Sequence, residues 1–213
     1  MALKTRKGKK DGKVEVATRS LLDSYLLRYH ERIHRDNLTK LTSHLDHDHP
    51  VKILIGEQNQ IMNTLSLLEK TREKFQQCGK FECATVEQWQ LLARSVNNFK
   101  KIDRHFHQEE ELLFPELVEY GFSSEVRQIM IEHNKVHELV DSLIATYNNG
   151  LRDNYGEMSA AINTIGPNLA RRIRLLAHRE SHILYPRVLR VISGQNSWQR
   201  LREIAQALHV RLT

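Results

Sequence analysis

Glycine and proline are scarce in this chain, with nine and four among its 213 residues. Alternating β-branched and aromatic residues, which mark strands, are also few, whereas Leu, Glu, Gln, Arg and Ala are abundant. The composition therefore predicts an all-helical (all-α) protein. The length suits one domain of four to six long helices, with enough residues to bury a full core.

Long hydrophobic runs are missing as well. No apolar stretch approaches the roughly 20 residues that a membrane-spanning helix needs. The chain begins with charged residues and lacks the apolar segment of a secretory signal peptide. We therefore expect a cytoplasmic protein with no membrane span.

The chain has only two cysteines, Cys78 and Cys83, which flank a short predicted loop. Four residues between them is wider than the usual spacing of zinc-binding thiolates, and there is no second pair to complete such a site. The sequence favours two reduced, incidental thiols and leaves a redox-responsive disulfide open.

The positive charge is concentrated in one terminal segment. The net charge is +6, yet residues 1–13 contain six Lys and Arg against Asp11 alone, which leaves 26 basic and 25 acidic residues elsewhere. We interpret residues 1–13 as a basic disordered tail. The nearly neutral remainder gives no reason to expect a structured nucleic-acid-binding module.

Apolar spacing and helix breakers predict where the helices lie. Residues 14–48 form an N-terminal helical extension, with helical patterns over 14–30 and about 38–45. Residues 49–213 form the main bundle with a short C-terminal helix. The helices predicted in it cover 49–77, 85–120 with a kink at Pro115, 123–150, a span from between 156 and 168 to 192, and 197–208. Short connections favour an up-down-up-down four-helix bundle.

Two segments share one motif. Residues 107–115 and 178–186 both read His-x-Glu-x-x-apolar-Leu-aromatic-Pro. His105 lies four residues before Glu109, and His133 lies four before His137, so the members of each pair share a helix face. Imidazoles and carboxylates that converge from several helices are how a bundle holds a metal. The motifs therefore predict a metal site.

These segments, together with the opening His-Pro-Val at residues 49–51 and the sequence around Glu57, resemble the hemerythrin-like (HHE) domain. That family is a four-helix bundle with a non-haem iron site. The resemblance implies that the metal ligands are His105, Glu109, His133 and Glu180, with His137 as a fifth.

The chain departs from the family pattern at two positions. Gln58 and Leu176 stand where the first and fourth helices of the family usually supply histidines, and this chain is similar to a subgroup that lacks both. Glu57, the neighbour of Gln58, is a substitute ligand if it turns inward. His178 and His182 lie on a different helix face from Leu176, so we expect them outside the site.

Imidazole and carboxylate ligands suit iron, manganese or zinc, and the lack of thiolates disfavours soft-metal or cluster sites. The resemblance implies non-haem iron, as one ion or two. Buried Glu109 and Glu180 would also need a cation between the helices, because neutral imidazoles do not offset their charge.

The sequence leaves three functions open. The first is an iron protein that binds, senses or responds to O2, nitric oxide or peroxide, or that handles iron. The second is a metal-depleted regulatory or scaffold bundle that binds a protein partner through residues 1–48. The third is a di-iron oxidoreductase acting on nitric oxide or peroxide. Reversible binding requires no acid or base, so the sequence favours a protein that is not an enzyme.

Overall fold

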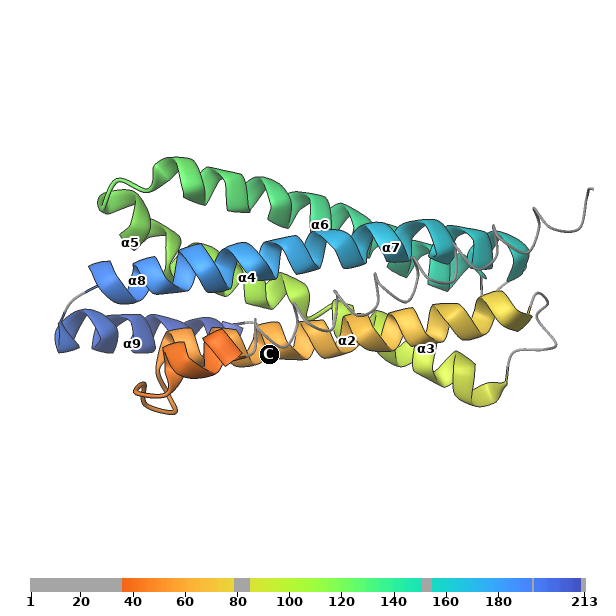
Figure 1. Cartoon of the computed structure of the whole chain (residues 1–213), viewed down its shortest axis with the longest axis horizontal. Coiled ribbons are helices and arrows are strands. Elements are labelled where there is room, and N and C mark those ends of the chain that lie inside the picture. Colours follow the sequence, from red (N-terminus) through yellow and green to blue (C-terminus); the bar gives the residue numbers. More distant parts are fainter. Residues whose placement is uncertain (1–35, 79–84, 151–154, 193, 212–213) are drawn as a thin grey trace, which may run out of the picture. The chain divides into compact units, whose positions relative to one another are not determined.

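The computed structural model describes residues 36–78, 85–150, 155–192 and 194–211 (Figure 1). Every regular element within these ranges is a helix. The basic tail, the helical pattern over 14–30, and Cys83 lie outside the described residues. Residues 36–42 are helical and belong to a unit that spans 1–43, whereas the bundle lies in the unit 44–213. None of the described helices is long and apolar enough to cross a lipid bilayer.

The bundle consists of long helical rods, some of them divided into segments. In chain order these segments are α2 (Pro50–Cys78), α3 (Val86–Phe99), α4 (Ile102–Leu112), α5 (Phe114–Glu119), α6 (Ser123–Gly150), α7 (Tyr155–Arg179), the π-helical η2 (Glu180–Leu184), α8 (Tyr185–Val191) and α9 (Gln195–Arg211). α2 and α6 run in one direction, and α3–α5 and α7–α8 run in the other (Figure 1). This is the predicted up-down-up-down arrangement, with α9 packed against α2 and α4.

Several helix ends follow the sequence signals. α2 begins at Pro50, whose missing N–H is not needed in the first turn, and the Val51 N–H donates to His49 Nδ1 at 3.2 Å. Thr85 and Gln88 form a capping box at the start of α3. α6 ends at Gly150 as predicted, while α9 extends beyond the predicted 197–208 at both ends.

The second rod differs from the single helix predicted over 85–120. It is divided at Lys100–Lys101, where the Lys101 N–H donates to Asn98 O at 3.1 Å, and again at Leu113, ahead of Pro115. The second division is the expected effect of proline, which removes one backbone donor and crowds the preceding turn. No proline or glycine lies at the first division, so no sequence signal predicts it.

The fourth rod contains a π-helical segment. Over Glu180–Leu184 the helix widens, and the Tyr185 N–H donates to the carbonyl of Glu180, five residues earlier. Pro186 follows immediately and has no N–H to donate to the preceding turn. Such π-helical insertions often lie at functional sites, because they change the direction of side chains within an otherwise regular helix.

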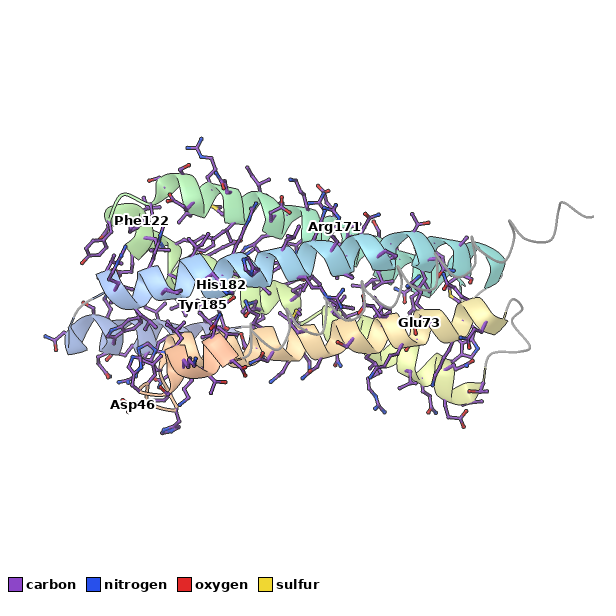
Figure 2. All side chains as sticks on the ribbon, in the orientation of Figure 1. Asp46, Glu73, Phe122, Arg171, His182 and Tyr185 are labelled. Atoms are coloured by element: carbon purple, nitrogen blue, oxygen red, sulfur yellow. The ribbon has the colours of Figure 1, made fainter. Side chains whose placement is uncertain are left out.

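The core is built from aliphatic and aromatic side chains of all four rods, and Tyr185 is labelled among the side chains in Figure 2. Leu65, Phe99, Leu143 and Tyr185 are at most 1% exposed, and each comes from a different rod. This packing holds the polar side chains described below in fixed positions.

We expect Leu143→Ala to lower the free energy of unfolding by about 2–5 kcal/mol, because it removes a fully buried side chain and leaves a cavity. Leu175→Ala is the control, since Leu175 is 52% exposed and its loss should change stability by less than about 0.5 kcal/mol. Urea unfolding monitored by circular dichroism measures both. Equal losses would show that α6 is not packed as described.

Candidate metal centre

Four titratable side chains meet in the interior of the bundle. His105 and Glu109 come from α4, His133 from α6 and Glu180 from the start of η2, and none is more than 2% exposed. The i, i+4 spacing of His105 and Glu109 puts both on the inner face of α4. The π-helical segment supplies Glu180 from the opposite rod.

The ligand-type atoms of these side chains face one another. One donor atom from each of His105, Glu109 and Glu180 lies within 4.8 Å of the others. His133 Nε2 lies 3.3 Å from Glu109 Oε2 and 3.7 Å from Glu180 Oε1. His105, Glu109 and Glu180 thus form a compact group of donors, and His133 lies beside its two carboxylates.

Each of these side chains also makes a hydrogen bond to a residue outside the cluster. Tyr185 donates its hydroxyl hydrogen to Glu109 Oε1 at 2.6 Å, and the Gln58 amide Nε2 donates to Glu180 Oε2. His105 Nδ1 lies 3.3 Å from a carboxylate oxygen of Glu57, and His133 Nδ1 lies 2.8 Å from one of Glu110.

A carboxylate at Nδ1 favours the tautomer with its hydrogen on that nitrogen, which leaves Nε2 of each histidine as the lone-pair donor.

Five buried atoms of these side chains make no hydrogen bond of good geometry with the described residues, although His133 Nε2 lies within ion-pair distance of Glu109 Oε2 and Glu180 Oε1. They are His105 Nε2, His133 Nε2, Glu109 Oε2, Glu180 Oε1 and the amide oxygen Oε1 of Gln58. Buried polar atoms are rarely left unsatisfied, and a cation among the imidazole nitrogens and carboxylate oxygens would give these donors a partner. Nitrogen and oxygen donors of this kind fit a divalent transition ion such as iron, manganese or zinc.

The shifted pKa values of His133 and Glu180 also favour a bound cation. Burial opposes the charged form of His133, but its contacts with Glu109, Glu110 and Glu180 raise the pKa of the imidazole to about 11. Burial and the neighbouring charge of Glu109 raise the pKa of Glu180 above its usual value. The cluster therefore holds protons that a bound cation would displace, and metal binding should release them.

Aromatic rings close one side of the cluster. The ring of Phe106 stacks on His133 with centroids 3.8 Å apart and planes 3° apart, and the ring of Phe114 lies 5.7 Å away from the same imidazole. These rings exclude water from the His133 side and fix the orientation of its imidazole. They also lower the local dielectric, which strengthens electrostatic interactions inside the cluster.

Two of the ligands expected from the sequence lie away from the inward-facing atoms. His137 Nδ1 contacts Asp103 Oδ1 at 2.7 Å, and the His137 side chain is 34% exposed. The Glu57 carboxylate is 15% exposed and lies between Arg104, at 3.2 Å, and Nδ1 of His105. In this arrangement Glu57 contacts the outer edge of the His105 ring.

His178, His182 and Leu176 lie on the helix faces that their spacing predicts. His178 and His182 are exposed and stack on each other with ring centroids 4.1 Å apart. Leu176 is a buried core residue, 3% exposed.

Sequence reasoning missed the contributions of Gln58, Glu110 and Tyr185. Only Tyr185 carried a signal, because it occupies the aromatic position of the repeated motif.

We expect Glu109→Gln and Glu180→Gln each to reduce the metal content of the purified protein sharply, because each removes a charged oxygen donor that faces the cluster. The matched control is Glu111→Gln, which makes the same change at an exposed position of α4. Metal per chain is measured by mass spectrometry. An equal loss in all three variants would contradict the location of the site.

The contact between Glu110 and Nδ1 of His133 can be tested by substitution. Glu110→Ala should weaken metal binding by roughly 10–100-fold, because the Nδ1–H of His133 loses its acceptor. Glu110→Gln should retain most of the affinity, since its amide oxygen still accepts a hydrogen bond. Competition with a chromogenic chelator gives the dissociation constants. If Ala and Gln weakened binding equally, the negative charge of Glu110 rather than the hydrogen bond would be what matters.

Comparison with known families agrees with this geometry. The hemerythrin HHE cation binding domain matches residues 49–188, which include all four members of the cluster. No curated protein matches the chain. The match covers well over half of the sequence, and the chain belongs to the hemerythrin HHE cation-binding domain family.

Proposed function

We propose that this protein holds one non-haem iron ion in the His105, Glu109, His133 and Glu180 cluster and that it binds or senses a small oxidant such as O2, nitric oxide or peroxide. The observation that carries the proposal is this set of buried nitrogen and oxygen donors, none of which makes a hydrogen bond of good geometry with the described residues. An iron ion held there would supply redox chemistry and a coordination position for a small ligand.

The contacts of the neighbouring side chains support one ion rather than two. A second ion would need further donors, and His137 and Glu57 are the nearest candidates from the sequence. His137 contacts Asp103, and Glu57 contacts Arg104 and His105. One donor atom from each of His105, Glu109 and Glu180 lies within 4.8 Å of the others, and His133 Nε2 lies within 3.7 Å of an oxygen of each carboxylate, so the donor set is suited to one ion.

The protein's own residues prepare the site for reversible binding. Tyr185 and Gln58 hold the two carboxylates, while Glu57 and Glu110 hold the two imidazoles. Phe106 and Phe114 exclude water beside His133.

The proposal is tested by metal content and absorption of anaerobically purified, iron-supplied protein. We expect about one iron per chain and a spectrum that changes when nitric oxide or air is added, with Glu180→Gln losing both. An iron content below about a tenth of an equivalent per chain that does not rise when iron is added would overturn the proposal. It would favour the regulatory or scaffold hypothesis. Sustained turnover of nitric oxide or peroxide with a reductant would favour the oxidoreductase.

A second prediction links the metal to stability. Ferrous iron added anaerobically to metal-free protein at a hundredfold excess over its dissociation constant should stabilise the fold by about 2.7 kcal/mol. For a domain of this size that corresponds to a rise of roughly 5–10 °C in Tm. Scanning calorimetry measures the shift, and Glu109→Gln should abolish it. A shift that persists in Glu109→Gln would mean that the iron binds elsewhere.

A further inference from the structure

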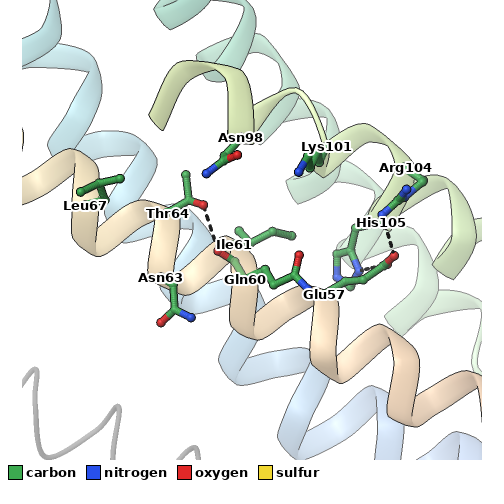
Figure 3. Close-up of a pocket in the computed structure, with 10 residues that line it drawn as sticks. All are labelled: Glu57, Gln60, Ile61, Asn63, Thr64, Leu67, Asn98, Lys101, Arg104 and His105. Carbon is green, nitrogen blue, oxygen red and sulfur yellow. Dashed lines mark hydrogen bonds and ion pairs between the residues drawn. The ribbon is translucent and has the colours of Figure 1, made fainter. Parts of the chain in front are cut away.

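A cavity of about 290 Å³ lies next to the metal centre (Figure 3). It is bounded by α2 on one side and by the junction of α3 and α4 on the other. Glu57 and His105 line one end, so the cavity and the metal centre share a wall. The division of the second rod at Lys100–Lys101 brings Lys101 to the cavity, and Arg104 follows one turn later.

The side chains around the cavity are rich in hydrogen-bond donors and in positive charge. The Lys101 ammonium and the amides of Gln60 and Asn98 make no hydrogen bond or ion pair within the part of the chain that the structure describes. Nε of Arg104 is buried and has no hydrogen-bond partner there either. Glu57 is the one carboxylate among the lining residues, and it is engaged by Arg104 and His105.

We propose that this cavity binds a small organic carboxylate. Two cationic side chains against one engaged carboxylate favour an anion, and the uncommitted N–H groups suit carboxylate oxygens. Ile61 and Leu67 provide an apolar wall for a carbon skeleton, which an inorganic oxyanion would not use. The volume of about 290 Å³ lies just below the roughly 300–1,000 Å³ range of small-molecule sites, so the ligand is a short-chain acid and not a nucleotide.

The cavity is connected to the metal centre through a short chain of contacts. Arg104 Nη2 lies 3.2 Å from Glu57 Oε1, and Glu57 Oε2 lies 3.3 Å from His105 Nδ1. A carboxylate that engages Arg104 competes with Glu57 for the guanidinium, so Glu57 becomes a stronger acceptor for the Nδ1–H of His105. This makes Nε2 of His105 a better metal donor.

The charges add to the same effect, because an anion in the cavity and a cation in the cluster attract each other across this wall. This coupling rests on the proposed function and requires that metal and carboxylate strengthen each other's binding by the same factor.

Isothermal titration of the full-length protein tests the proposal. Acetate, succinate, glutarate and inorganic phosphate are titrated at constant ionic strength into metal-free protein and into protein loaded with redox-inert zinc. The variant is Lys101→Gln. The control is Lys100→Gln, which removes the same charge from an exposed neighbour that does not line the cavity.

We expect succinate or glutarate to bind the metal-free protein, and to bind the zinc-loaded protein at least about fivefold more tightly. Lys101→Gln should weaken this binding about tenfold, and Lys100→Gln should leave it unchanged. The site is overturned if none of the three carboxylates binds, if both variants weaken binding equally, or if phosphate binds as tightly as succinate. Unchanged affinity on zinc loading would overturn the coupling alone. Failure to load zinc would count against the metal centre, while the metal-free titration would still decide the cavity.

Discussion

The interior of this bundle contains two carboxylates that no lysine or arginine side chain pairs with in the described part of the chain. Glu109 and Glu180 are at most 2% exposed, and their charged neighbours are the imidazoles of His105 and His133. Burying a carboxylate without a compensating charge costs several kcal/mol. Protons on the imidazoles can offset this cost in the metal-free protein, and a divalent cation can do so without any proton at Nε2.

The rest of the centre is arranged around this constraint. Each carboxylate has one oxygen bound to a neutral donor, Tyr185 or Gln58, and the other oxygen directed inward. Neutral donors stabilise a buried carboxylate while leaving its charge available. An arginine at either position would neutralise the carboxylate and compete with a metal. The choice of tyrosine and glutamine therefore keeps the interior attractive to a cation.

Most of the fold could be predicted from the sequence because its signals are local. The scarcity of breakers, Pro50 at a first helical position and the Thr85 capping box each depend on a few neighbouring residues. The i, i+4 spacing of His105 and Glu109 likewise fixes a shared helix face. The division at Lys100–Lys101 is different, since neither residue disfavours a helix. α3 packs against α2 and α6, whereas α4 also contacts α9, and periodicity does not encode such contacts between helices.

The repeated motif shows where sequence reasoning reaches its limit. Pro115 and Pro186 occupy equivalent positions, yet the chain divides into separate helices before the first and forms a π-helical segment before the second. The same proline constraint has two structural solutions, and the surrounding contacts select between them. Gln58 is a second example, because the sequence shows only that glutamine replaces the histidine expected at this position. In the structure its amide holds Glu180 and presents an oxygen inward.

The two histidines of the cluster have unlike surroundings, and the cluster is therefore asymmetric. Phe106 and Phe114 pack against His133, whereas His105 is backed by the partly exposed Glu57 and by a polar cavity. The polar and partly exposed surroundings of the cluster therefore lie on the His105 side. We expect a change in charge there to act on His105 and to leave His133 shielded by the two rings. The proposed coupling depends on this asymmetry, because a symmetric site would respond equally on both sides.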